Sequence, residues 1–335
     1  MKPNVKSVEN QVEQVSDYAD SKLTSVEYIG PAVKEMEEKK RGKLKSGYLE
    51  RENILAYILV APAVIILVLF IAYPFVLGVW LSLTDKTVGQ EGHFVGLQNF
   101  RNILKSQIFI QTVQNTFIYT GVATVLKLVF GLALALVLNR QFKFKRLVRA
   151  SMLLPWIIPT VLSTLAWLWM FDATFSVFNW ILVHLGILKR GLVWLGDPHL
   201  AMVSVIIVNA WRGIPFFAIS LLAGLQTISP DLYEAADMDG AGSFAKFWHI
   251  TLPMLMPVLL VVLIFSVIVT FADFQVVYVL TRGGPSNSTH LFATLAYQVA
   301  LASGRLGEGA AISLFMFPFL LLVIIVQLWY IRREQ

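Results

Sequence analysis

Six apolar runs, each long enough to cross a lipid bilayer as a helix, recur along this sequence. A bilayer core of about 30 Å needs roughly 20 consecutive apolar residues in helical form. Composition agrees, because 57% of the residues are hydrophobic and 14% are charged, against about 45–50% and about 25% in a soluble domain. The sequence therefore predicts an all-α, polytopic membrane protein with six transmembrane helices. These helices are expected at about residues 54–83, 113–138, 149–171, 200–223, 254–280 and 309–331.

The first fifty residues are polar and mixed in charge, and they contain no apolar run that could act as a cleavable signal peptide. We expect residues 1–50 to form a cytoplasmic tail and residues 51–335 to form the membrane domain. Fourteen basic residues flank the spans on the side of the N-terminus and seven flank them on the other side. Because Lys and Arg gather in cytoplasmic loops, we expect a multi-pass protein of a bacterial cytoplasmic (inner) membrane with both termini inside. An odd number of spans would instead place Arg332 and Arg333 outside.

Several kinds of chemistry are disfavoured by the residues that the sequence lacks. There is no cysteine, which excludes disulfides, thiol catalysis and Cys-ligated metals. The five histidines are scattered without paired spacing, so no metal site is expected. No GxxxxGK[ST] phosphate loop occurs, so this chain cannot hydrolyse ATP by that route. We expect no cofactor in this chain.

One inner loop carries an acidic segment, residues 229–253, that interrupts the hydrophobic pattern. Ser229 and Pro230 form a helix-start signal, with Asp231 in the first turn where the helix dipole favours it. Gly240 and Gly242 are expected to end the helix about ten residues later. A helix this short cannot span the membrane, and we expect it to dock into another protein.

The run EAADMDGAGSFAKFWHITLP, from Glu234 to Pro253, resembles the cytoplasmic EAA signature of ATP-binding-cassette (ABC) importer permeases. Further stretches resemble the carbohydrate-uptake branch, in particular the larger maltose-type permease: FVGL at 94–97, LPW at 154–156 and TRGGP at 281–285. The resemblance implies a type I ABC importer permease fold with a cytoplasmic coupling helix. The signature residues that fall in register are Glu234, Ala235, Ala236, Gly240, Ile250, Leu252 and Pro253.

The same resemblance implies a function and a set of partners. The chain would be a permease subunit, not an enzyme, that translocates a sugar or related carbohydrate delivered by an extracytoplasmic binding protein. Glu234, Ala235, Ala236 and Gly240 would form the coupling contact with an ABC ATPase dimer, which would bind the ATP. A dimeric ATPase has two docking grooves, so a second, similar permease is implied. A heterodimer is typical of the maltose-like branch, and a homodimer stays open.

Three ionisable residues, Lys127, Arg212 and Asp273, fall inside predicted spans, where charged groups are expensive and usually functional. Helical spacing places polar and aromatic residues on one face of the fourth span and polar residues on one face of the fifth. The resemblance implies that these two faces line a mid-membrane sugar site. An Arg212–Asp273 ion pair that only joins two helices is the alternative, and Lys127 is open between a structural role and contact with solute. The candidate substrate-binding residues are Asn209, Arg212, Gly213, Phe216, Ser266, Thr270 and Asp273.

Two other classes of protein compete with this interpretation. A secondary, ion-coupled transporter would be expected to show internal repeats, and none has convincing residue matches. A membrane-embedded glycosyl transferase would need interfacial carboxylates such as Asp231, Glu234, Asp237 and Asp239, but these lie within the EAA match.

Overall fold

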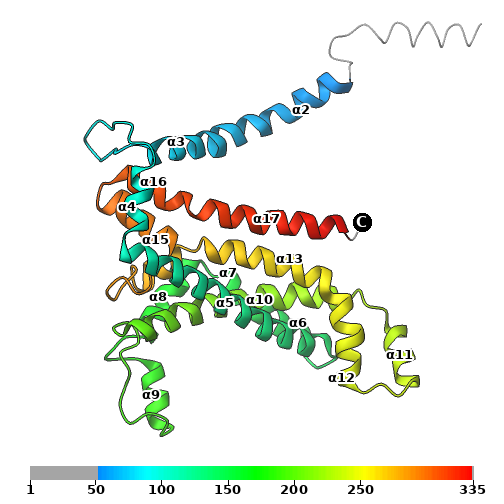
Figure 1. The fold of residues 1–335 in the computed structure, drawn as a ribbon. Helices are drawn as coiled ribbons and strands as arrows, with labels where there is room; N and C mark the ends of the chain where they lie inside the picture. The colour runs from blue at the N-terminus through cyan, green and yellow to red at the C-terminus, as the bar shows by residue number, and fades with distance from the viewer. Residues whose placement is uncertain (1–51, 334–335) are drawn as a thin grey trace, which may run out of the picture. The chain divides into compact units, whose positions relative to one another are not determined.

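The structure, a computed structural model, describes residues 52–333 and is helical throughout this range apart from turns and loops (Figure 1). The predicted tail at residues 1–50 lies outside the described residues. An isolated antiparallel bridge joins Thr84 and Phe94. The helices and π-helical segments are α2 (Glu52–Leu67), η1 (Val68–Ala72), α3 (Tyr73–Ser82), α4 (Gln98–Leu104), α5 (Gln107–Asn139), α6 (Lys145–Met152), α7 (Leu154–Ile157), α8 (Thr160–Met170), α9 (Val177–His184), α10 (Pro198–Leu225), α11 (Pro230–Met238), α12 (Ser243–Lys246), η2 (Phe247–Thr251), α13 (Leu252–Phe271), α14 (Gln275–Leu280), α15 (Phe292–Tyr297), η3 (Gln298–Ala302), α16 (Leu306–Leu314) and α17 (Met316–Arg333).

The chain divides into two compact units, residues 1–75 and 76–335, and each is described by itself. The described part of the first unit is one apolar helical stretch, in which α2 continues through η1 into the start of α3. Pro62 lies inside α2, which apolar helices in membranes tolerate when neighbouring groups satisfy the freed carbonyl. The second unit contains α5, α10 and α13, whose mutual packing forms its centre.

Five helices of the described chain are long and apolar enough to cross a membrane: Ala56–Ser82, Gln107–Asn139, Pro198–Leu225, Ser243–Phe271 and Leu306–Trp329. They match the predicted spans one, two, four, five and six. The predicted third span, 149–171, is not one helix. It is a bent pair, Lys145–Ile157 and Thr160–Met170, whose axes differ by 90°. The cause is Pro159, which has no N–H to continue the helix and holds Ile158 in an extended conformation (ψ 131°).

The predicted fifth span, 254–280, also needs correction. Its long helix begins earlier, at Ser243, and ends at Phe271. A separate short helix, α14, follows after Ala272–Phe274. The Asp273 carboxylate accepts a long hydrogen bond (3.4 Å) from Val276 N in the first turn of α14. A polar side chain that caps a new helix favours such a break over a continuous apolar helix.

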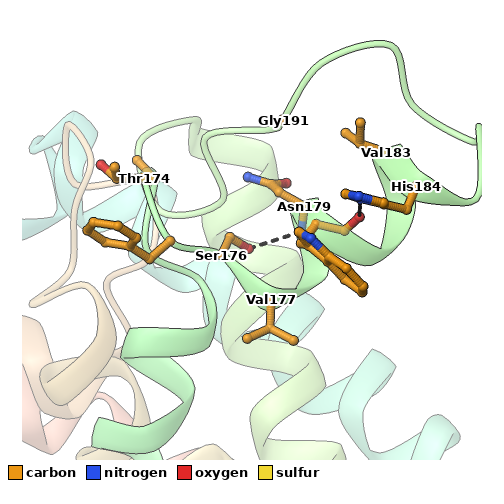
Figure 2. A pocket seen from close by; sticks show the side chains of 10 residues that line it. Thr174, Ser176, Val177, Asn179, Val183, His184 and Gly191 are labelled. Atoms are coloured by element: carbon orange, nitrogen blue, oxygen red, sulfur yellow. Dashed lines mark hydrogen bonds between the residues drawn. The ribbon is translucent and has the colours of Figure 1, made fainter.

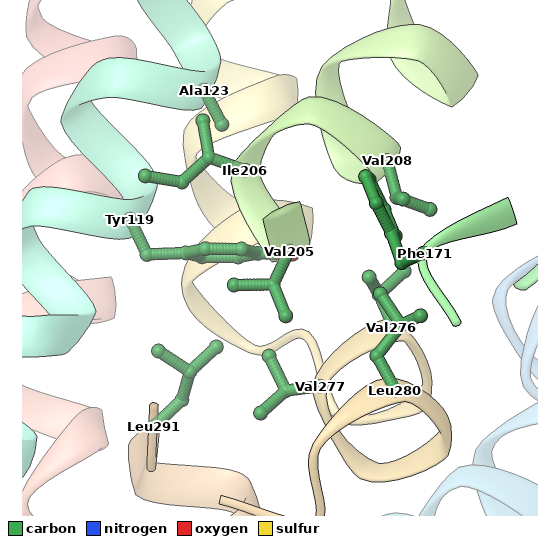
Figure 3. Close-up of a cluster of buried hydrophobic side chains, with 10 residues drawn as sticks. All are labelled: Tyr119, Ala123, Phe171, Val205, Ile206, Val208, Val276, Val277, Leu280 and Leu291. Carbon is green, nitrogen blue, oxygen red and sulfur yellow. The ribbon is translucent and has the colours of Figure 1, made fainter. Parts of the chain in front are cut away.

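Three clusters of buried apolar side chains hold the second unit together. The first joins α5, α10 and α14 around Tyr119, Val205 and Val276 (Figure 3). The second lies toward the C-terminal ends of α5 and α10, where Leu138 and Leu221 pack with Leu255 of α13. The third connects α4, α5, α15 and α16. Polar residues between the first two clusters are therefore enclosed by packed helices.

Candidate functional site

A row of polar side chains follows one face of α5, at the three- and four-residue spacing that keeps residues on the same side of a helix. All of them are buried. Polar side chains in a membrane-spanning helix turn toward the interior of the bundle, where they find partners or line a cavity. The row therefore marks the face of α5 that looks onto α10 and α13. It consists of Thr112, Asn115, Thr116, Tyr119, Thr120, Thr124 and Lys127.

Asp273 is the meeting point of three helical elements. Its Oδ2 accepts hydrogen bonds from Tyr119 Oη of α5 (2.6 Å) and from Asn209 Nδ2 of α10 (2.8 Å). Tyr119 has no exposed surface, and its ring lies in the first apolar cluster while its hydroxyl reaches the carboxylate (Figure 3). Two donors on one oxygen compensate the burial of this partly buried group.

Lys127 makes the second cross-connection, about two turns beyond Tyr119 along α5. Its Nζ donates to Thr270 Oγ1 of α13 at 2.8 Å. Its aliphatic stem lies against Gly213 of α10, where an added Cβ would stand 2.6 Å from Cδ and Cε of the lysine. Glycine at 213 therefore provides the space through which Lys127 passes between the helices.

Arg212 and Asp273 do not form an ion pair in the described part of the chain, whose ion pairs involve other residues. Asp273 is engaged by Tyr119 and Asn209 instead. Arg212 is half-buried, and its Nε is enclosed without a hydrogen-bond partner. The geometry thus favours separate roles for the two charges over an ion pair that joins their helices.

Five enclosed polar atoms near this network, Arg212 Nε among them, have no hydrogen-bond partner among the described residues. Buried polar groups without partners are rare in proteins, and each asks for an explanation such as a missing ligand or water. The faces of α5, α10 and α13 that meet here therefore hold unused hydrogen-bonding capacity. The atoms are Thr120 Oγ1, Thr124 Oγ1, Asn209 Oδ1, Arg212 Nε and Ser266 Oγ.

Phe216 lies one turn beyond Arg212 on α10 and is covered by other aromatic rings. It stacks on Trp156 of α7, with ring centroids 4.9 Å apart and an interplanar angle of 19°. Its ring centroid also lies 5.2 Å from that of Phe265 of α13. Trp211 packs edge-on against Trp167 of α8, with ring centroids 5.4 Å apart. One face of the Phe216 ring is thus covered by Trp156, which the break between α7 and α8 brings to the site.

The predicted docking helix is α11. Ser229 caps it through a hydrogen bond from Asp231 N (3.3 Å). At its end Gly240 adopts the left-handed conformation (φ 77°), and Ala241 N donates back to Ala236 O at 2.9 Å, the hydrogen-bonding pattern of a glycine-terminated helix. Glu234, Ala235 and Gly240 are exposed, and Ala236 is half-buried.

Two side-chain contacts connect α11 to the elements that continue into α13. Tyr233 Oη lies 3.0 Å from Thr251 Oγ1 of η2, and Lys246 Nζ of α12 pairs with Asp237 Oδ1 at 2.7 Å. Tyr233 also packs against the second apolar cluster. A displacement of α11 would therefore be transmitted to α13, which carries Ser266 and Thr270.

A hollow of about 740 Å³ lies beside α9, at the end of the second unit opposite α11 in Figure 1. Thr174, Trp180 and His184 are among the residues that line it (Figure 2). The amide of Asn179 in its wall donates to Leu192 O and accepts from Leu192 N and the Trp194 indole. Backbone N–H groups of Phe175 and Thr174 bind Asp172 and lower its pKa. The polar groups here hold the loop together, so we do not place the solute site in this hollow.

The structure joins Asp273 and Thr270 to α5 by direct hydrogen bonds from Tyr119 and Lys127, joins Asn209 to Asp273, and places Gly213 against Lys127. Tyr119 and Trp156 join this site although they were not among the predicted site residues. The periodic polar row on α5 was a signal that could have found Tyr119, because a polar face in an apolar span points inward. Trp156 could not have been placed without the bend at Pro159.

A helical, multi-pass chain with a polar site enclosed by three helices and a short, mostly exposed helix at one end has the arrangement expected of a membrane transport subunit. The chain belongs to the family of binding-protein-dependent transport system inner membrane components, whose sequence profile matches residues 127–335. It is therefore a transmembrane permease subunit of an ABC importer, in which a separate subunit hydrolyses ATP and a binding protein delivers the solute.

Relatives and solved structures agree with this family. The chain is 39% identical over 279 residues to the trehalose/maltose transport system permease protein MalF of Thermococcus litoralis, covering 83% of this chain and 94% of that protein. It is 37% identical over 286 residues to the sulfoquinovosyl glycerol transport system permease protein SmoG of Agrobacterium fabrum, covering 85% and 92%. A bacterial ABC transporter that imports the acidic polysaccharide alginate has the same fold, with a TM-score of 0.73, 23% identity and coverage of 85% and 97%.

Proposed function

We propose that this permease imports a sugar or related carbohydrate, and that the solute binds in the membrane where α5, α10 and α13 meet. The relatives named for sugars support the class of solute. The observation that carries the location is the group of enclosed polar atoms without partners around the Tyr119–Asp273–Asn209 and Lys127–Thr270 contacts. Sugar hydroxyls both donate and accept hydrogen bonds, so they would satisfy these atoms.

Individual residues have separate roles in this proposal. Ser266 Oγ and Asn209 Oδ1 would bind hydroxyls, and the Arg212 guanidinium would donate to ring or hydroxyl oxygens. Lys127 and Thr270 would act together, because one contact joins them. Phe216, braced by Trp156, would offer its free edge to the apolar face of the sugar. Gly213 would keep the space that Lys127 needs.

Coupling would run through α11. Glu234, exposed near the middle of this helix, would contact the ATPase subunit, Ala235 and Ala236 would allow close approach, and Gly240 would set the turn. Rigid movement of α11 with the ATPase would shift α13 and open the solute site alternately to the two sides of the membrane. A second permease subunit would occupy the other ATPase groove, and both termini of this chain would lie in the cytoplasm.

Ser266 offers a sharp test, because its hydroxyl has no partner in the described chain and Ser266→Ala therefore removes no internal hydrogen bond. The complete transporter, with ATPase and binding protein, is reconstituted in proteoliposomes, and ATP-dependent uptake of labelled maltose and trehalose is measured. We expect a KM several-fold higher at unchanged assembly. Ser204→Ala is the control, since Ser204 is also buried but its hydroxyl binds Leu200 O of its own helix (2.8 Å).

Wild-type uptake kinetics in both Ser266→Ala and Arg212→Ala would contradict the proposal that the solute binds at this site. Uptake by the chain alone, driven by a proton gradient without ATP, would contradict the importer assignment and favour an ion-coupled transporter.

A further inference from the structure

Ten residues at the C-terminal end of α5, 140–149, form a corner that we call the basic corner. It carries five basic residues: Arg140, Lys143, Lys145, Arg146 and Arg149. Large apolar side chains alternate with them, and Phe144 and Leu147 are 77% and 68% exposed. Phe142 is exposed as well. The transport mechanism proposed above uses none of these residues.

The positive charge of the basic corner has no ion-pair partner among residues 52–333, which the structure describes. The sequence contains no Asp or Glu between Glu91 and Asp172, and the ion pairs of the described chain do not include any of the five basic residues. Like charges this close repel one another unless anions neutralise them. Within the part of the chain that the structure describes, the corner thus presents positive charge that an external anion can neutralise.

The C-terminal end of the basic corner, at Val148 and Arg149, is attached to the helix bundle. Arg149 Nη2 donates to Leu138 O in the last turn of α5 at 3.1 Å, a favourable place for a cation at a helix C-terminus. Val148 packs against the second apolar cluster. Between these anchors and α5, Phe144 adopts a left-handed backbone conformation (φ 63°). The exposed aromatic and basic side chains are therefore displayed from a fixed turn.

The position along the chain identifies the source of the anions. The corner directly follows Asn139, the last residue of a 33-residue helix that is long enough to span a membrane. A helix of 33 residues is about 50 Å long and exceeds the acyl core of about 30 Å, so residues just beyond its end reach the headgroup region. Exposed Phe and Leu side chains suit the acyl boundary, while Lys and Arg extend to phosphate groups.

We infer that the basic corner binds the headgroups of anionic phospholipids, with Phe142, Phe144 and Leu147 inserted at the acyl boundary. Basic residues attract anionic leaflets over about a Debye length. The orientation proposed above places the corner in the cytoplasmic leaflet, but headgroup binding itself does not depend on that orientation.

The experiment uses the complete transporter, reconstituted in vesicles of equal parts phosphatidylcholine and phosphatidylglycerol and then extracted in mild detergent. Mass spectrometry measures the two lipids that stay bound. We expect wild type to retain phosphatidylglycerol several-fold over phosphatidylcholine and Lys143→Glu/Arg146→Glu to lose this preference. Lys189→Glu/Arg190→Glu is the matched control, because it makes the same change of charge at two exposed residues after α9.

An unchanged preference in Lys143→Glu/Arg146→Glu would overturn the inference. So would a variant that keeps its phosphatidylglycerol and loses the ATPase subunit on purification, since the corner would then be a protein interface. Should the double variant fail to assemble, wild type in high salt decides the matter: headgroup binding to the corner requires that retained phosphatidylglycerol falls as salt rises, and salt-independent retention contradicts it.

Discussion

The stem of Lys127 lies directly on Gly213, and this contact aims the ammonium of α5 at Thr270 of α13. A glycine on one helix thus determines where a charge from another helix ends. Lys127 and Gly213 lie on different spans, and the sequence alone gives no indication that they are in contact.

Gly213→Val should displace Lys127 and reduce transport. The added Cβ alone would stand 2.6 Å from Cδ and Cε of the lysine, and overpacking of this kind costs about 1–3 kcal/mol. We expect ATP-dependent uptake in proteoliposomes to fall roughly ten-fold while the subunits still co-purify, because misplaced binding groups reduce turnover strongly. Gly121→Val on α5 is the control, since an added Cβ there meets nothing within 4 Å. Equal effects of the two variants would contradict a specific role for the Lys127–Gly213 contact.

Tyr119 and Asp273 should be energetically coupled. Removing the tyrosine hydroxyl forfeits a hydrogen bond to a carboxylate, worth about 1 kcal/mol inside a membrane protein, and Asp273→Ala leaves two buried donors without their acceptor. A double-mutant cycle of Tyr119→Phe and Asp273→Ala, measured by thermal stability in detergent, should give a coupling energy of about 0.5–3 kcal/mol.

The same cycle between Thr112→Val and Asp273→Ala should be additive, because the Thr112 hydroxyl binds only Ile108 O of its own helix. Additivity in the Tyr119 cycle would show that the 2.6 Å contact does not contribute to stability.

Sequence reasoning found five spans because each is a long apolar run, although it set both ends of the fifth too late. It placed α11 because Ser229, Pro230 and Gly240 act through local backbone chemistry. It treated the third span as continuous, although Pro155 and Pro159 were visible. A proline tells where a helix can bend, but the packing of α7 on α10 and of α8 on α14 decides how far.

The site shows the same limit. Helical spacing put Asn209 and Arg212 on one face and Thr270 and Asp273 on another, and the structure joins those faces through α5. Which side chain meets Asp273 depends on distances between helices far apart in the sequence. Helical periodicity cannot supply these distances. The sequence therefore suggests Arg212 as a partner of Asp273, whereas the structure shows Tyr119 and Asn209 in that role.

Glu234→Lys should uncouple ATP hydrolysis from uptake. Glu234 is exposed on α11 and makes no ion pair within the described chain, so its charge reversal should leave the fold intact while opposing the ATPase contact. We expect uptake to fall more than ten-fold at near-normal stability, since like-charge contacts in an interface cost several kcal/mol. Glu91→Lys is the control, because it makes the same reversal of charge at an exposed residue of the loop after α3 that forms no ion pair within the described chain. Wild-type uptake in Glu234→Lys would contradict the coupling role.

His290 should make the transporter less stable in mild acid. Its ring is 2% exposed, lies against Gly283 and contacts Thr294 Oγ1 at 3.2 Å, and burial lowers its pKa from the ordinary 6.5. The unfolded chain therefore takes up a proton near pH 6.5 that the folded chain refuses, so the contribution of the neutral ring is complete above this pH and is lost as pH falls below it. We expect the melting temperature to decrease between about pH 7 and 5 and this decrease to be smaller in His290→Gln.

His184→Gln changes an exposed histidine and should leave the slope as in wild type. An identical acid slope in wild type and His290→Gln would show that the buried ring does not govern this pH dependence.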